Sequence, residues 1–84
     1  GLVNRVVPAD DLVATACEYA ERIARNAPLA VQAAKELALR SRDMSLAEGL
    51  RMEQLVNRML AATGDAKEGR AAFKEKRDPV STAS

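Results

Sequence analysis

The residues best suited to bind a ligand lie near the end of the chain, where Phe73 precedes Lys76 by three positions. In a helix this spacing places the aromatic ring and the ammonium group on one side, together with Gly69, which leaves room for close approach. An aromatic surface can receive a nucleotide base, and a lysine can bind a phosphate as a point charge. In an alternative interpretation Phe73 fills a small core and Lys76 extends to water. The two interpretations agree if the ligand lies at the edge of the core.

A second side of the same segment carries a basic stripe. Its members are Lys67, Arg70, Lys74 and Arg77. Such a stripe can mark a nucleic-acid-binding helix. Acidic residues at positions 68, 75 and 78 interleave with it, however, and aromatic stacking platforms are missing. We therefore predict a solvated helix face without a nucleic-acid partner, and a basic binding domain remains an alternative.

No combination of residues predicts a catalytic or metal site within the chain. Histidine is absent, and Cys17 is the single cysteine. A nucleophilic thiol needs a neighbouring base and zinc needs several nitrogen or sulfur ligands, so we expect Cys17 to be a small buried thiol. Carboxylates are numerous, but no pair is singled out for acid–base chemistry. Glu53 interrupts an apolar helix face, which predicts the rim of a contact or a position opposite a partner's arginine.

The composition describes one small domain with a thin core. The chain has 84 residues, of which 48% are hydrophobic, but 17 residues are alanine and tryptophan is absent. A chain this short buries only about 60% of the surface that its unfolded form exposes, so we expect it to be stabilised by packing against a partner surface. The net charge of +1 points to no charged polymer, and the lone cysteine favours the cytoplasm. No apolar run is close to the roughly 20 residues that cross a membrane.

Hydrophobic periodicity predicts four helices after a short strand. Residues 1–8 contain a β-branched run typical of a strand, but the chain offers it no partner strand, which suggests a piece of a larger fold. The predicted helices span residues 10–26, 28–42, 46–62 and 65–77. Pro79 prevents continuation of the fourth helix, and residues 80–84 are expected to fray.

Capping signals support the starts of the last two predicted helices. Ser45 and Glu48 form a capping box before the third helix. Asp65 and Glu68 have the same spacing at the start of the fourth helix, after the breaker Gly64.

The third predicted helix carries more apolar surface than one contact requires. At 100° per residue its apolar residues spread over roughly 220° of the circumference, whereas a stripe of about 100° suffices for a surface helix. These residues are Leu46, Leu50, Met52, Leu55, Val56, Met59 and Leu60. We expect this helix to be covered on one side within the chain and on another by a second body. A stand-alone interaction module that dimerises through this helix would explain the same pattern.

Four motifs in chain order give the sequence a resemblance to the enoyl-CoA hydratase/isomerase (crotonase) superfamily. They are the leading segment Gly1–Pro8, the run Asn26-Ala27-Pro28-Leu29-Ala30 followed by Lys35, the run Ser45–Leu50 with Glu53, and Asp65–Gly69 with Ala72–Arg77. Each motif alone is weak. Together, in this order and spacing, they resemble the superfamily rather than one reaction within it.

The resemblance implies the C-terminal helical domain of an enzyme whose catalytic core lies outside these residues. Residues 1–8 would be an extended strand or linker from that core, residues 9–79 the helical domain that forms oligomer contacts and covers part of the CoA pocket, and residues 80–84 a frayed tail. The expected fold is all-α, a small bundle of four helices after a short strand. The whole enzyme would be a lyase or isomerase acting on acyl-CoA, most simply by hydrating 2-enoyl-CoA in fatty-acid metabolism, as a trimer or hexamer.

The same resemblance assigns roles to two residues. Lys76 is similar to a lysine that reaches the CoA nucleotide in some members, and Phe73 beside it shapes the helix packing. No catalytic residue and no metal ligand is implied within the chain, and no separate cofactor, because CoA is part of the substrate. These helices alone are expected to be inactive. Many members have an aromatic residue after the position of Pro79, where this chain has Val80, so the tail is expected to dock less firmly.

Overall fold

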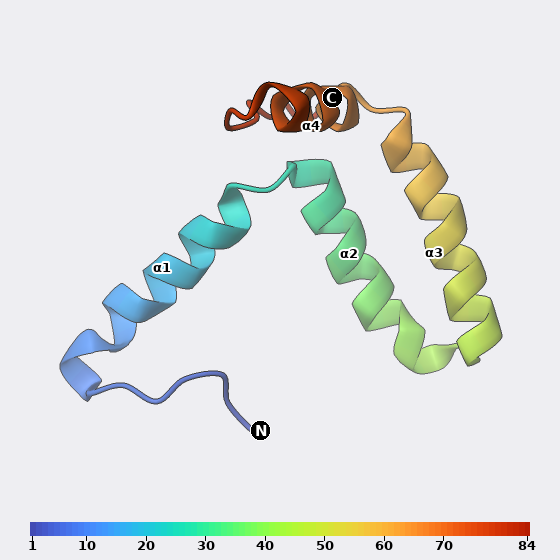
Figure 1. Cartoon of the computed structure of the whole chain (residues 1–84). Helices are drawn as coiled ribbons and strands as arrows, with labels where there is room; N and C mark the ends of the chain where they lie inside the picture. Colours follow the sequence, from blue (N-terminus) through green and yellow to red (C-terminus); the bar gives the residue numbers. More distant parts are fainter.

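The computed structural model describes all residues, 1–84, as an open arch of helices (Figure 1). In chain order the elements are η1 (Ala9–Asp11), α1 (Leu12–Ala24), α2 (Pro28–Arg40), η2 (Ser41–Asp43), α3 (Leu46–Ala61) and α4 (Gly64–Glu75), where η marks a single 3₁₀ turn. Figure 1 shows α2 and α3 side by side and antiparallel, α4 across one end of this pair, and α1 pointing away from it. The predicted all-α class with four helices is confirmed.

The four helices are spread out as an open arch rather than packed closely around one core. The arch measures 43 × 39 × 18 Å, and its Cα radius of gyration is 16.1 Å. A compact domain of this length has a radius of about 12 Å. The main contacts between helices join α2 to α3 and α3 to α4, and Ala72 is the single apolar residue that is fully buried. On α3 in particular, large apolar side chains on more than one side of the helix cannot all face one small core.

The leading segment forms no strand, and this part of the prediction is wrong for the chain as described. Residues 1–8 have no regular secondary structure, and the side chains of Leu2 and Val6 are almost fully exposed. A strand requires hydrogen bonds to a neighbouring strand, and the arch contains none that could pair with it.

The first two helices end slightly before their predicted ends. Ala27 precedes Pro28 and takes an extended backbone conformation, with φ of −57° and ψ of 121°. A proline disfavours helical backbone in the residue before it, so α1 stops short of this point. The Asn26 side-chain amide donates to the carbonyl oxygens of Arg22 at 3.0 Å and Ile23 at 3.2 Å, which satisfies two carbonyls of the last turn.

The start of α3 agrees with the prediction in detail. The Glu48 backbone N–H donates to Ser45 Oγ at 3.2 Å, and the Ser45 backbone N–H donates to Glu48 Oε2 at 3.1 Å. This reciprocal pair is the capping box that the sequence predicted.

The start of α4 differs from the prediction. The N-cap is Thr63, whose hydroxyl accepts from the Ala66 backbone N–H at 3.2 Å. Asp65 and Glu68 do not form a capping box, because their carboxylates bind the residues that follow α4. The N-cap therefore lies two residues earlier than the pair Asp65 and Glu68 suggested.

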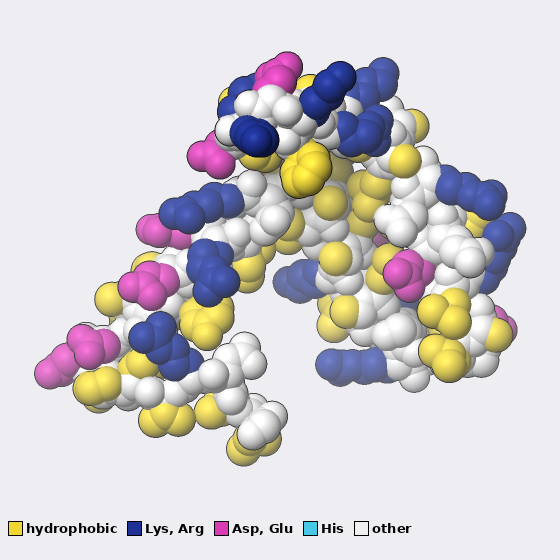
Figure 2. All heavy atoms as spheres, viewed as in Figure 1, with side chains coloured by type: hydrophobic (Ala, Val, Ile, Leu, Met, Phe, Trp, Pro, Cys, Tyr) yellow, Lys and Arg dark blue, Asp and Glu magenta, His cyan; other side chains and the backbone are white.

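Large apolar side chains remain exposed along the arch. On α3, Met52, Val56 and Leu60 are partly covered, whereas Leu50 and Met59 are 51% and 73% exposed. Figure 2 shows hydrophobic side chains gathered along the lower side of α1 and around the turn between α2 and α3. The side of α3 that packs within the chain is thus present as predicted, and apolar residues on either flank of it have no cover in this structure.

Candidate binding site at the end of the last helix

The end of α4 is a tight left-handed turn centred on Lys76. The Lys76 backbone N–H donates to the Phe73 carbonyl at 3.3 Å, and the Arg77 N–H donates to the Ala72 carbonyl at 3.0 Å. These two bonds form a Schellman motif, which closes many helices and usually places glycine in the left-handed position. Here Lys76 occupies it with a φ of 53°. This conformation costs a non-glycine residue about 1–2 kcal/mol, so the surrounding contacts must hold it in place.

The two candidate ligand residues both face solvent. Phe73 is 88% exposed, and Ala72 beside it is the buried residue instead, so the interpretation in which Phe73 fills the core is wrong for this chain. Lys76 is exposed and takes part in none of the ion pairs. Figure 2 shows other Lys and Arg side chains gathered over the same helix. An aromatic ring and a free ammonium are therefore available at this end of α4, without a wall from the rest of the chain.

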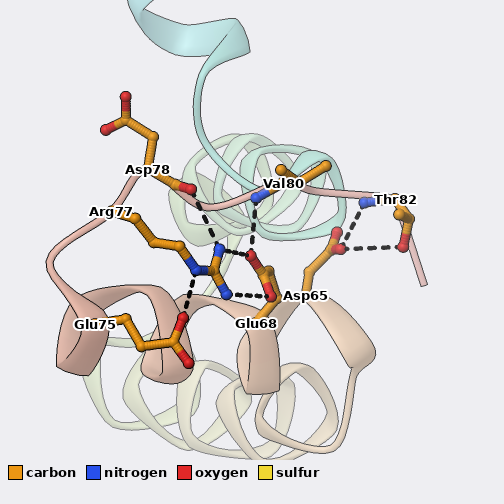
Figure 3. A network of polar contacts seen from close by, with 7 residues as sticks. All are labelled: Asp65, Glu68, Glu75, Arg77, Asp78, Val80 and Thr82. Atoms are coloured by element: carbon orange, nitrogen blue, oxygen red, sulfur yellow. Dashed lines mark hydrogen bonds and ion pairs between the residues drawn. The ribbon is translucent and has the colours of Figure 1, made fainter.

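Arg77 leaves the basic stripe and folds back onto α4 (Figure 3). Its Nη1 and Nη2 pair with the two carboxylate oxygens of Glu68, the latter at 3.2 Å, and its Nε pairs with Glu75 at 2.6 Å. Glu68 Oε1 also accepts the backbone N–H of Val80 at 3.1 Å. The helix ends at Glu75, before the position at which Arg77 would have joined the stripe. We call the group of Glu68, Glu75 and Arg77 the arginine clasp.

Asp65 holds the last residues of the chain against the first turn of α4 (Figure 3). Its side chain is buried, Oδ1 accepts the backbone N–H of Thr82 at 2.7 Å, and Oδ2 accepts that of Ala83 at 3.0 Å. In return the Asp65 backbone N–H donates to the Ser84 carbonyl at 2.8 Å. A carboxylate is also favoured at a helix N-terminus by the helix dipole. The tail is ordered by these bonds, so the expectation that residues 80–84 fray is wrong for this structure.

A close approach of backbone explains the glycine at the start of α4. A Cβ atom on Gly64 would lie 3.0 Å from Ser84 Oγ and 3.1 Å from the Ser84 carbonyl oxygen. Such contacts are tighter than most Cβ contacts, so a side chain here would require Ser84 to shift by a few tenths of an ångström. Gly64, which the sequence suggested only as a helix breaker, thus also makes room for the docked tail.

The arginine clasp perturbs the acidity of its own members. The hydrogen bonds from Arg77 and then from the Val80 backbone lower the pKa of Glu68 from 4.5 to about 2. The bonds to Glu68 and Glu75 raise the pKa of Arg77 above its ordinary value. The Glu68 carboxyl therefore binds a proton more weakly in the clasp than when the clasp is open. The stability that the Glu68 carboxylate gives to the clasp is fully present above the ordinary pKa of 4.5 and is lost as the pH falls toward 2.

Acidification should accordingly open the clasp. The amide resonance of Val80, followed by NMR during an acid titration of this chain, should shift with a midpoint well below the ordinary carboxyl pKa of 4.5. Glu68→Gln should remove this transition, because glutamine does not titrate, while other carboxyl transitions persist. A Val80 midpoint at the ordinary value in the parent chain would contradict the clasp.

The docked tail forms one wall of a recess at the joint between α1 and α2. The recess has a volume of about 550 Å³. Its lining residues are Ala24, Arg25, Pro28, Asp78, Pro79, Val80 and Ser81. Neither Phe73 nor Lys76 lines it. The structure therefore does not join the recess to the candidate ligand residues, and a molecule held at Lys76 would need a further wall from outside the chain.

A larger groove runs between α2 and α3 on the exposed flank of α3. Its volume is about 620 Å³, and its large apolar lining residues are Leu37, Met44, Leu46 and Leu50. Glu53 is one of the residues that line this groove, and its role at the rim of a contact stays a prediction. The groove is an apolar surface suited to a protein partner rather than a site with converging polar groups.

The remaining expectations concern reactive and metal-binding groups. Cys17 is exposed, so the prediction of a buried thiol is wrong. No cluster of three or more acidic or cysteine side chains is arranged to hold a metal ion. Each helix is too short or too polar to span a bilayer.

Comparison with known proteins identifies relatives along nearly the whole chain. A family model described as enoyl-CoA hydratase/isomerase matches residues 1–83. The 2,3-dehydroadipyl-CoA hydratase of Escherichia coli is 43% identical over 79 residues, which cover 94% of this chain and 31% of that protein. The (E)-benzylidenesuccinyl-CoA hydratase of Thauera aromatica is 46% identical over 80 residues, which cover 95% of this chain and 31% of that protein.

The solved structures agree with the sequence relatives. The crystal structure of an enoyl-CoA hydratase from Bacillus anthracis matches with a TM-score of 0.93 at 43% identity, covering 100% of this chain and 33% of that one. The chain thus spans about a third of the length of these relatives. The arch, open by itself, has the same backbone course as one part of a larger protein. With the family model matching residues 1–83, the chain belongs to the enoyl-CoA hydratase/isomerase family.

Proposed function

We propose that this chain is the C-terminal helical part of an enzyme that hydrates 2-enoyl-CoA thioesters in fatty-acid metabolism, in the cytoplasm. The observation that carries this proposal is the uncovered apolar surface of an arch whose backbone matches a third of an enoyl-CoA hydratase. Large exposed apolar surfaces of this kind mark places where another part of a protein, or another protein, packs. Two relatives are named as hydratases of unsaturated CoA thioesters, which favours hydration over the isomerase alternative.

The chemistry of hydration assigns the reacting groups to other parts of that enzyme. Addition of water to a 2-enoyl thioester requires donors for the negative charge on the thioester oxygen, together with groups that activate water and deliver a proton. This chain has no histidine, and no pair of its carboxylates converges on a common cavity. We assign these residues oligomer contacts, through the flanks of α3, and part of the CoA pocket. A purely structural interaction module would use the same flanks, and family membership favours the enzyme.

Lys76 is the residue that we assign to the CoA nucleotide, with Phe73 beside it. Its ammonium is exposed and takes part in no ion pair, whereas the neighbouring Arg77 is engaged by two carboxylates. A free lysine cation can bind a phosphate as a point charge, and an exposed aromatic ring can receive the adenine face. The further wall of this site would come from the catalytic core or from a neighbouring subunit.

The test is Lys76→Ala in the whole enzyme. Loss of one charge-assisted contact should weaken binding of a 2-enoyl-CoA by about 1 kcal/mol or more, which raises KM about fivefold while kcat stays close to the parent value. Inhibition by free CoA should weaken to the same extent. Lys74→Ala, which removes an exposed lysine two residues away, is the matched control. An unchanged KM and unchanged CoA inhibition in Lys76→Ala would remove Lys76 from the site.

A further inference from the structure

We infer that Glu68 and Arg77 are positioning residues, which fix the left-handed turn at Lys76 and keep its ammonium free for the CoA phosphate. This inference rests on the proposed function. It adds two residues that need not touch the substrate and that act through Lys76. The arginine clasp supports it with three features: the arrangement of its bonds around Lys76, the strain of the turn, and the neutralisation of nearby carboxylates.

The bonds of the clasp lie on both sides of Lys76. Arg77 follows Lys76 directly, and its Nε pairs at 2.6 Å with Glu75, which precedes Lys76 directly. The other end of the same guanidinium is held by both oxygens of Glu68, two helical turns earlier on α4. A bidentate arginine–carboxylate pair fixes orientation as well as distance. The backbone of Lys76 is therefore anchored to the body of α4 through its two neighbours.

The turn at Lys76 requires such an anchor. A lysine at a φ of 53° is in a conformation that a free helix end would leave, since other backbone conformations are lower in energy for residues with a side chain. Without the clasp only the two backbone bonds of the Schellman motif would hold the turn. A backbone turn that is already fixed where the ligand needs the side chain to start loses less conformational freedom on binding, which improves affinity.

The clasp also pairs two carboxylates of α4, those of Glu68 and Glu75, with a single cation. Arg77 pairs with both of them, and Lys76 pairs with neither. Glu68 further accepts the Val80 N–H, so the same pair directs the tail away along α4. The clasp thus holds the turn and leaves Lys76 as the unpaired cation.

The experiment compares two substrates in the whole enzyme, a short 2-enoyl-CoA and the matching 2-enoyl-pantetheine, which lacks the nucleotide phosphates. Glu68→Gln should raise KM for the CoA thioester about threefold to tenfold, with kcat unchanged, because it loosens the backbone turn that carries Lys76. The pantetheine thioester, which has no group for Lys76, should show no change. In a Lys76→Ala background, Glu68→Gln should have no further effect on the CoA thioester.

Further variants separate positioning from general damage. Arg77→Lys keeps the charge but lacks the planar fork, so it should resemble Glu68→Gln. Glu36→Gln, which breaks an exposed Glu–Arg pair of 2.9 Å on α2, should resemble the parent. Glu68→Gln could also lower the yield of folded enzyme. The ratio of KM for the CoA thioester to KM for the pantetheine thioester still tests the positioning role in that case, because both values are measured on the same folded protein.

The outcomes distinguish the positioning role of Glu68 and Arg77 from the assignment of Lys76 to the CoA nucleotide. Equal loss on both substrates, or a further loss in the Lys76→Ala background, would overturn the positioning role. So would parent-like kinetics of Glu68→Gln alongside an impaired Lys76→Ala, which would leave the proposed function intact. A Lys76→Ala enzyme that binds CoA normally would instead contradict the assignment of Lys76 itself.

Discussion

In the oligomer that we propose for the whole enzyme, Leu50→Asp should separate the subunits. Leu50 lies at the apolar groove between α2 and α3 and is 51% exposed in this chain. In a subunit contact, the substitution would place an unpaired carboxylate on an apolar surface, which costs several kcal/mol. At micromolar concentrations such a loss is enough to separate subunits whose association it weakens by several powers of ten. Sedimentation velocity should show a smaller species than the parent enzyme.

A second substitution tests the opposite flank of α3. Met59 is 73% exposed and lies on the other side of the partly covered strip formed by Met52, Val56 and Leu60. Met59→Asp should also reduce the sedimentation coefficient if both flanks are covered by other subunits. Arg58→Asp, an acidic substitution on the polar side of the same helix, is the control. Parent-like sedimentation of both Leu50→Asp and Met59→Asp would argue against an interface here.

Asp65→Asn should release the tail from α4. The asparagine side chain has the same size, but one of its two acceptor oxygens becomes an NH₂ donor, which would face the backbone N–H of Thr82 or Ala83. Loss of one hydrogen bond to a charged group costs about 1.5–3 kcal/mol. Hydrogen exchange of the Thr82 and Ala83 amides should therefore accelerate by about tenfold to a hundredfold.

The control for this variant is a second acidic residue close to the tail. Asp78→Asn changes a carboxylate that takes part in no ion pair, so the exchange rates at Thr82 and Ala83 should stay at parent values. Equal exchange rates in Asp65→Asn and the parent chain would mean that Asp65 does not hold the tail.

The features that could be predicted from the sequence are those set by residues close together along the chain. The four helices, the capping box of Ser45 and Glu48, and the partly covered side of α3 all follow from spacings of three or four residues. Errors at the helix ends were small and had local causes, such as the effect of Pro28 on Ala27.

The arginine clasp and the docked tail could not be predicted in this way. Asp65 binds the amides of residues 17 and 18 positions later, and Glu68 binds Arg77 nine positions later. The spacing of Asp65 and Glu68 fits a capping box equally well, and only the three-dimensional path of the tail decides between the two. The position of Lys76 in the left-handed turn was also missed, because this position is usually glycine.

Exposure was the other property that the sequence could not decide. Periodicity places Phe73 and Cys17 on apolar faces, yet both are exposed, because the arch does not close over those faces. The periodicity describes the surfaces that the whole fold covers, and this chain holds only one side of those contacts. The four predicted helices are present, and their arrangement is open for the same reason.

The order of contacts along the arch has a consequence for how it folds. The main contacts join α2 to α3 and α3 to α4, each pair adjacent in sequence, and no strand pairing must wait for distant segments. Folds of such low contact order form rapidly, since little loop entropy is lost before each contact forms. We therefore expect α2, α3 and α4 to assemble as an early unit. Packing of α1 is then expected to be the slow step, because α1 packs only when another part of the enzyme covers its apolar side.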